Sequence, residues 1–123
     1  MTDARFVGVL DLSSYKGPST TLGEMVLNQD FAFIDYRGLR WDAHKGDIIG
    51  GAHIPQIFKA IIGGSYQSPY LGAAVLHDVW CRNKKRSWRD TDEMFFEAMI
   101  TNGVSFVKSY AMWLAVYVGG PRW

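Results

Sequence analysis

The spacing of hydrophobic and polar positions changes near residue 69, and this change divides the chain into two kinds of predicted element. Before it, short apolar runs are separated by turn-forming residues, which is typical of β-strands. After it, apolar residues recur every three or four positions, which is typical of helices packed on one side. The pattern therefore predicts an α+β fold, in which a small antiparallel β-sheet is followed by three helices.

The predicted sheet centres on a hairpin over residues 31–44. Its two strands flank Arg37-Gly38, and a two-residue turn with glycine in second place is a hairpin signal. The other apolar runs predict two further strands, separated by a loop rich in turn-forming residues. These strands are predicted at 5–12 and 24–27, and the loop at 13–21.

Three helices are predicted after the sheet, at about 69–82, 88–102 and 104–118. Ser68-Pro69 supplies a hydroxyl cap followed by a proline that suits the first helical position. Ser87 and Asp90 have the spacing of a capping box at the start of the second helix. Glycines follow the second and third helices, where a helix commonly stops.

The third predicted helix is apolar on every side, with only Ser105, Lys108 and Ser109 as polar residues. A helix of this kind is either buried all round or shared with a partner. Central burial in the fold and exposure at a subunit interface are both compatible with the pattern. The second alternative predicts an oligomer or another bound protein, with an interface formed by Phe106, Tyr110, Trp113 and Tyr117.

Composition narrows the class of protein. With 123 residues the chain corresponds to a single domain, 1–123, and its 48% hydrophobic content argues against disorder. A net charge of only +1 makes a role in nucleic-acid binding unexpected. The single cysteine, Cys81, excludes an internal disulfide and fits a reducing cytoplasm. The sequence has neither a signal peptide nor the roughly 20 consecutive apolar residues of a membrane span.

A basic cluster occupies the predicted connection between the first two helices. It contains five cations and one aromatic residue: Arg82, Lys84, Lys85, Arg86, Trp88 and Arg89. Such a cluster can bind phosphate, nucleic acid or an acidic partner. More commonly it forms a solvated turn between helices, and both interpretations remain open.

His77 and Asp92 are the strongest candidates for chemistry. In an antiparallel helical hairpin they lie about 9 and 6 Å from the turn, at ~1.5 Å per residue, so they can meet. Asp92 lies on an apolar stripe and needs a partner there. Either Asp92 orients His77 as a general base, with Asp78 available for a metal or substrate, or the pair is structural and Asp78 pairs with Arg82.

Several segments, in their order along the chain, resemble a phage and prophage family catalogued as domain of unknown function 1353. The similarity covers about residues 31–123 and rests on four segments: Gly46 with Ile54-Pro55, Ala73 to Asp78, Asp92 with Phe95 to Met99, and Ala115-Val116 through Gly119. The resemblance implies a phage-encoded structural or adaptor protein, associated with the virion or tail. It would be made in the host cytoplasm and would pack with copies of itself or with other phage proteins.

The chain departs from the family pattern at several polar positions. Ile49-Gly50 and His53 stand where the family has Thr-Asp and Ser, and Cys81 and Trp88 stand where it has Tyr and Arg. These changes remove polar groups that would cooperate with His77. They favour the structural role.

The A-A-x-x-H-D run and the later aspartate are also similar to phospholipase A2 enzymes. This resemblance implies that His77 is the base, Asp78 a calcium ligand and Asp92 the orienting carboxylate. The glycine-rich calcium loop and the disulfides of the secreted enzymes are absent. A small hydrolase is thus the alternative function, and calcium enters only with it; otherwise no cofactor is expected.

Overall fold

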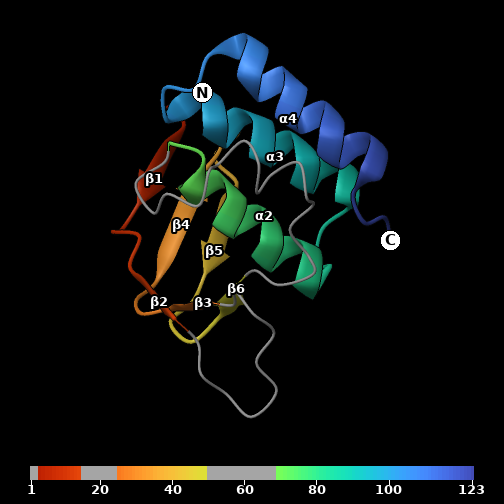
Figure 1. Cartoon of the computed structure of the whole chain (residues 1–123). Helices are drawn as coiled ribbons and strands as arrows, with labels where there is room; N and C mark the ends of the chain where they lie inside the picture. The colour runs from red at the N-terminus through yellow and green to blue at the C-terminus, as the bar shows by residue number, and fades with distance from the viewer. Residues whose placement is uncertain (1–2, 15–24, 50–68) are drawn as a thin grey trace.

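Two small antiparallel sheets lie beside three helices in the computed structural model, which describes residues 3–14, 25–49 and 69–123 (Figure 1). The predicted α+β class and the order of sheet before helices are confirmed. Several predictions fall outside the described residues, among them most of the 13–21 loop, the Ser68 cap, and the family positions at Gly50, His53 and Ile54-Pro55.

The first sheet has the strand order β1-β4-β5, and the second has the order β2-β3-β6. All neighbouring strands are antiparallel. The first sheet consists of β1 (Arg5–Val7), β4 (Phe31–Ile34) and β5 (Arg40–Ala43). The second consists of β2 (Leu12–Ser14), β3 (Met25–Leu27) and β6 (Ile48–Ile49).

The predicted single strand over 5–12 is wrong, because the chain breaks at Gly8 and forms two strands in different sheets. Gly8 has φ +88°, a conformation that strands do not contain and that favours glycine. A Cβ at this position would lie 2.8 Å from the Asp30 carbonyl oxygen. The bend is therefore fixed by a close backbone approach. The second of the two strands also occupies the start of the predicted loop.

The hairpin between β4 and β5 forms as predicted, but its turn is longer. Asp35 N donates to Leu39 O at 2.9 Å, so the loop contains three residues, 36–38, rather than the predicted two. A two-residue type I′ turn needs positive φ at both central residues, which Arg37 disfavours. The three-residue loop needs it only at Gly38, whose φ is +85°.

Asp35 holds this hairpin closed from inside. Its carboxylate accepts hydrogen bonds from Trp41 Nε1 at 3.1 Å and from the backbone N–H groups of Arg37 and Leu39 at 2.9 and 3.0 Å. Burial acts to raise the pKa of Asp35, but these bonds and the Arg37 guanidinium outweigh it and leave the pKa below its usual value. The buried carboxylate thus stays charged and anchors the turn to the core.

The three helices are α2 (Leu71–Asn83), α3 (Trp88–Thr101) and α4 (Phe106–Gly119). The predicted cap of α3 is confirmed, because Ser87 Oγ accepts from Asp90 N at 3.1 Å. Helix α2 begins two residues later than predicted. Pro69 precedes it in a turn, where the Pro69 carbonyl accepts from Asn102 Nδ2 at 2.8 Å.

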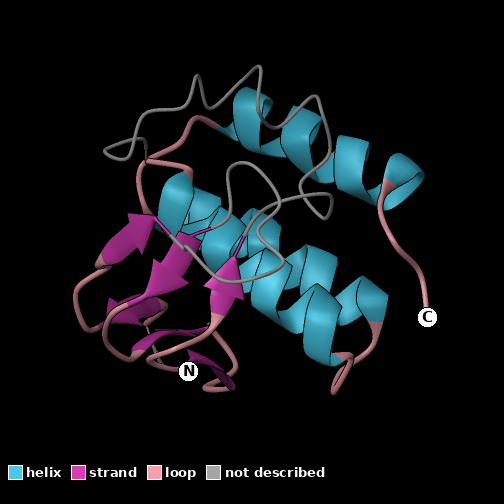
Figure 2. Ribbon diagram, turned by 60° about the horizontal axis from the view of Figure 1, so that its bottom comes forward, coloured by secondary structure: helices cyan, strands magenta, loops and turns pink. Residues whose placement is uncertain are grey.

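The elements are layered, with α2 and α3 between the sheets and α4 (Figures 1 and 2). Helix α2 packs on β5, β6 and α3, whereas α4 packs mainly on α3. The largest fully buried side chains join the sheets to the first two helices: Leu27, Phe33, Trp41, Leu76, Phe95 and Met99. Within the described ranges, no helix is long and apolar enough to cross a membrane, as the sequence predicted.

Candidate functional site: a buried His-Asp pair and an aromatic face

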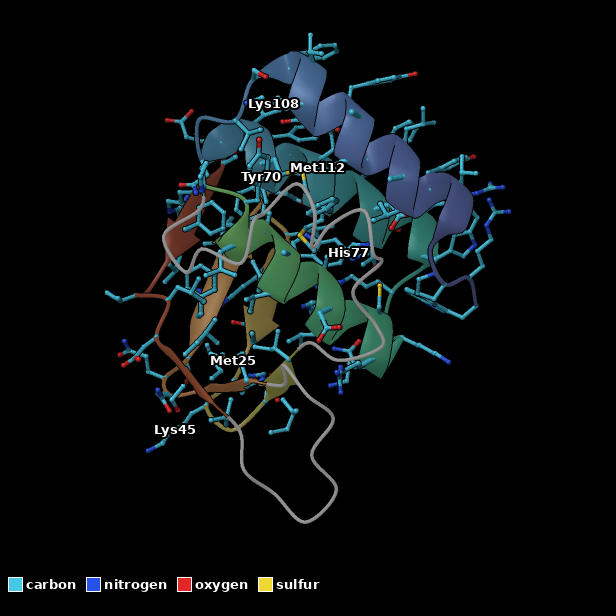
Figure 3. All side chains as sticks on the ribbon, in the orientation of Figure 1. Met25, Lys45, Tyr70, His77, Lys108 and Met112 are labelled. Atoms are coloured by element: carbon cyan, nitrogen blue, oxygen red, sulfur yellow. The ribbon has the colours of Figure 1, made fainter. Side chains whose placement is uncertain are left out.

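The predicted contact between His77 and Asp92 is confirmed. His77 Nε2 lies 2.7 Å from Asp92 Oδ1, so the two side chains join α2 to α3. Figure 3 labels His77, which belongs to α2. Because a carboxylate oxygen accepts, His77 Nε2 carries the proton and donates. The residues are only 5% and 3% exposed, so the pair lies within the helical interface.

Phe95 and Cys81 also lie against His77. The Phe95 ring lies 4.9 Å from the imidazole, and Cys81 Sγ lies 3.7 Å from each ring nitrogen. Burial raises the pKa of the Cys81 thiol to about 12, and the carboxylates of Asp92 and Asp78 add to the rise. A thiol with this pKa is not a nucleophile at neutral pH, so the Cys81–His77 contact is not an activated pair.

Asp78 pairs with Arg82, as the structural alternative predicted. Arg82 Nε donates to Asp78 Oδ2 at 3.0 Å, and Asp78 is 3% exposed. Calcium binds six to eight oxygen ligands. In the part of the chain that the structure describes, no three His, Cys, Asp or Glu side chains are grouped to hold a metal ion.

The basic cluster is divided between internal contacts and solvent. The Arg86 guanidinium carbon lies 4.4 Å from the centre of the Trp41 ring and 4.5 Å from that of Trp80. Trp123 also contacts Arg86: its Nε1 donates a hydrogen bond to Arg86 O at 2.8 Å. Arg89 lies over Trp88, at 5.2 Å from the ring centre. Lys84 and Lys85 are exposed.

A cleft of about 460 Å³ lies beside this connection. Arg82 and Lys85 form part of one wall, and Asp42 and Asp47 form part of the other. Asp42 already accepts from Arg40 Nε at 2.7 Å. Carboxylates of the β5–β6 region therefore balance part of the positive charge of the basic cluster. The sequence did not indicate this, because the two segments are far apart along the chain.

The four predicted interface residues lie on one stripe of α4 and belong to a continuous run of aromatic contacts. Successive ring centres along this run are 4.9 to 6.3 Å apart. We call the run the aromatic ladder; in spatial order it contains Phe96, Phe106, Tyr110, Trp113, Tyr117 and Trp88. The two ends come from α3, so the ladder runs along both helices.

Only one side of α4 is buried. Ser109, Met112 and Val116 face α3, whereas Phe106 is 66% and Val118 69% exposed. Central burial of this helix is therefore wrong, because the sheets are already covered by the two other helices and α4 packs mainly on α3. The other alternative, an interface with a partner on the exposed outer face, stays a prediction.

An open groove of about 510 Å³ lies beside the ladder, which sequence reasoning missed. Four aromatic rings, two carboxylates and one aliphatic side chain line it: Tyr36, Phe96, Tyr110, Trp113, Glu93, Glu97 and Ile100. Tyr36 N, from the β4–β5 turn, donates to Glu97 Oε2 at 3.1 Å and closes one side. The spacing of Glu93 and Glu97 indicates a shared helical face, but only the tertiary contact with residue 36 makes that face a groove.

Comparison with known proteins finds relatives that are themselves uncharacterised. The chain is 44% identical over 97 residues to the uncharacterized protein y4jT of Sinorhizobium fredii (strain NBRC 101917 / NGR234), covering 79% of this chain and 29% of that protein. It is 31% identical over 118 residues to y4iH of the same strain, covering 96% of this chain and 48% of that protein. The chain thus spans less than half the length of either relative. No solved structure matches it.

The model of one family, described as "Protein of unknown function (DUF1353)", matches residues 25–116. The matched region contains the His77–Asp92 pair, the groove and most of α4. The family resemblance seen in the order of the sequence segments is therefore confirmed, and this chain belongs to the DUF1353 family.

Proposed function

We propose that this domain is a protein-binding module that serves as a structural or adaptor component, with a phage particle or tail as its setting. The observation that carries the proposal is the exposed apolar face of α4. Monomeric proteins rarely leave large contiguous apolar patches exposed, and such patches often mark interaction sites. Phe106, Val107 and Val118 are each more than 60% exposed on this helix.

The chemistry of the face suits protein partners. Tyrosine, tryptophan and arginine are enriched among the residues that dominate binding energy at protein interfaces. The ladder contains phenylalanine, tyrosine and tryptophan. Arg122 lies at one end of it, 4.6 Å from the centre of the Trp88 ring. Ring-to-ring contacts hold these side chains in place, so less conformational entropy is lost when a partner binds.

The relatives support a modular role. Two longer proteins of one strain contain regions similar to this chain, which matches 29% of one and 48% of the other. A domain that recurs within longer chains suits a binding module joined to different neighbours. The partner is either another copy of the chain or a different phage protein.

The test is incorporation into particles of the phage that encodes the chain, measured by quantitative mass spectrometry of purified particles. We expect the wild-type chain in the particles, and at least a tenfold loss when Phe106→Ser and Val107→Ser are combined. Val9→Ser is the matched control, because Val9 is 69% exposed but lies outside the helices. Absence of the wild-type chain, or undiminished incorporation of the α4 variant, would overturn the proposal.

A second candidate function, a small hydrolase, is favoured by the His77–Asp92 hydrogen bond. Asp92 accepts from Nε2, so a catalytic His77 would take a proton from water at Nδ1. Against this, the pair is buried and neither cleft described above includes it. Phospholipid vesicles and simple esters, assayed with and without calcium, provide the test. Activity that falls at least 100-fold in His77→Gln would support hydrolysis, and no turnover by the wild type would exclude these substrates.

A further inference from the structure

The groove beside the ladder has the composition of a cation-binding site. Carboxylates supply negative charge, and the faces of tyrosine and tryptophan attract cations through the ring quadrupole. Glu93 and Glu97 lie one helical turn apart on α3, and Tyr110 and Trp113 come from α4. The two kinds of group therefore face a common space although they belong to different elements.

Arg37, the cation whose charge acts on Glu97, is already engaged with groups next to the groove. Arg37 contacts Asp35 Oδ2 at 3.4 Å, and its guanidinium carbon lies 5.9 Å from the centre of the Tyr36 ring. Burial raises the pKa of Glu97; Asp35 and Glu93 add to the rise, whereas the Tyr36 hydrogen bond and Arg37 oppose it. Charging Glu97 is thus harder in the free domain than in water, and a bound cation would offset part of this cost.

The same molecule already stacks guanidinium groups on its aromatic rings elsewhere. Arg122 lies 4.6 and 5.8 Å from the ring centres of Trp88 and Tyr117, at one end of the ladder. At the groove, no arginine or lysine of the described residues stacks on Tyr110 or Trp113. The groove thus offers aromatic faces and carboxylates to a cation from outside.

We propose that the groove binds an arginine side chain of a partner polypeptide. The planar guanidinium can stack on Trp113 while it donates to Glu93 and Glu97, a combination that the compact lysine ammonium matches less well. A volume of about 510 Å³ exceeds one side chain, so Ile100 and Phe96 would contact an apolar neighbour of the arginine. This inference rests on the proposed function, because it specifies the partner chemistry of the same surface.

The test begins with selection of binders from a displayed library of random heptapeptides on the intact wild-type chain. We expect arginine next to an apolar residue to be enriched. The best peptide is then made with citrulline, which keeps the shape of arginine but is uncharged, and we expect its Kd to rise at least tenfold. Glu97→Gln should weaken the arginine peptide by a similar factor. Asp90→Asn, which removes a carboxylate of α3 outside the groove, should leave its Kd within twofold.

Other outcomes would overturn the inference in distinguishable ways. Enriched peptides that are apolar and lack arginine would contradict it while leaving the protein-binding function standing. Equal affinity for the arginine and citrulline peptides would do the same. By contrast, self-association in sedimentation that both Glu97→Gln and Arg122→Gln abolish would support the inference, with a second copy of the chain as the partner that supplies the arginine. If the combined Phe106→Ser and Val107→Ser variant entered particles as well as the wild type does, the proposed function itself would be overturned.

Discussion

His77 and Asp92 are 15 positions apart in the sequence, and their hydrogen bond of 2.7 Å joins α2 to α3 inside the protein. Asp92 Oδ2 has no hydrogen-bond partner among the described residues, so His77 carries much of the stabilisation of this buried carboxylate. The bond is a structural requirement of the helical pair, whether or not it also has a chemical role.

Removing either partner should therefore destabilise the fold. We expect Asp92→Ala and His77→Ala each to lower the free energy of unfolding by about 2–4 kcal/mol, because the remaining partner loses this hydrogen bond inside the helical interface. In a double-mutant cycle measured by urea denaturation, the two effects should be clearly non-additive. Glu93→Gln, an exposed neighbour on α3, is the control and should change stability by less than about 0.5 kcal/mol. Additive effects, or none, would contradict the contact.

Asp35 should give the domain acid sensitivity. Its folded pKa lies below that of an unfolded aspartate, so its contribution is present above about pH 3.9 and is lost as the pH falls through the lower folded pKa. Asp35→Asn should cost about 2–3 kcal/mol at pH 7 and flatten the acid limb of the stability profile. Urea midpoints between pH 2.5 and 7 would measure this, with the partly exposed Asp42→Asn as the control. An unchanged acid limb would contradict it.

Glu97 should show the opposite dependence. The pKa of Glu97 is raised in the folded state. Its favourable contribution to folding stability is therefore present below the pKa of the unfolded chain and is lost as the pH rises through the folded pKa. The stability of Glu97→Gln relative to the wild type should therefore increase between pH 4 and pH 7. The effect is small, since the residue is only partly buried. A relative stability that falls over this range would show that the carboxylate is not desolvated.

Cys81 should be inert in the folded protein. With a thiol pKa of about 12, its thiolate fraction at pH 8 is roughly 10⁻⁴, and the side chain is also buried. Iodoacetamide labelling followed by mass spectrometry should be slow under native conditions and fast in urea. Rapid native labelling would indicate that the α2–α3 interface opens readily. Cys81→Ser is the reference for unspecific labelling of other residues.

The two faces of α4 should respond differently to truncation. Met112 is 1% exposed against α3, so Met112→Ala should cost about 2–4 kcal/mol through the cavity it leaves. Leu114 is 41% exposed on the outer side, and Leu114→Ala should change stability by less than about 0.5 kcal/mol. Urea denaturation of the isolated chain compares them. Equal costs would mean that the outer face is covered within the monomer.

Local features of the fold could be predicted because they depend on neighbours in sequence. The cap formed by Ser87 and Asp90 spans a single turn. The His77–Asp92 contact follows from helical spacing and a short connection. Strand predictions were weaker, because the break at Gly8 is caused by the backbone of Asp30, which belongs to a distant segment. The turn after Asp35 likewise depends on which residue tolerates positive φ.

The sequence by itself determined the α+β class, the three helices, the buried His77–Asp92 pair and an apolar α4, because periodicity and capping are local properties of the chain. Only the tertiary structure decided which side of α4 is exposed, since burial depends on which elements already cover the sheets. It also decided that Tyr36 closes a groove over Glu97, 61 residues away. Contacts of that range come from the packing of whole layers, which no local pattern records.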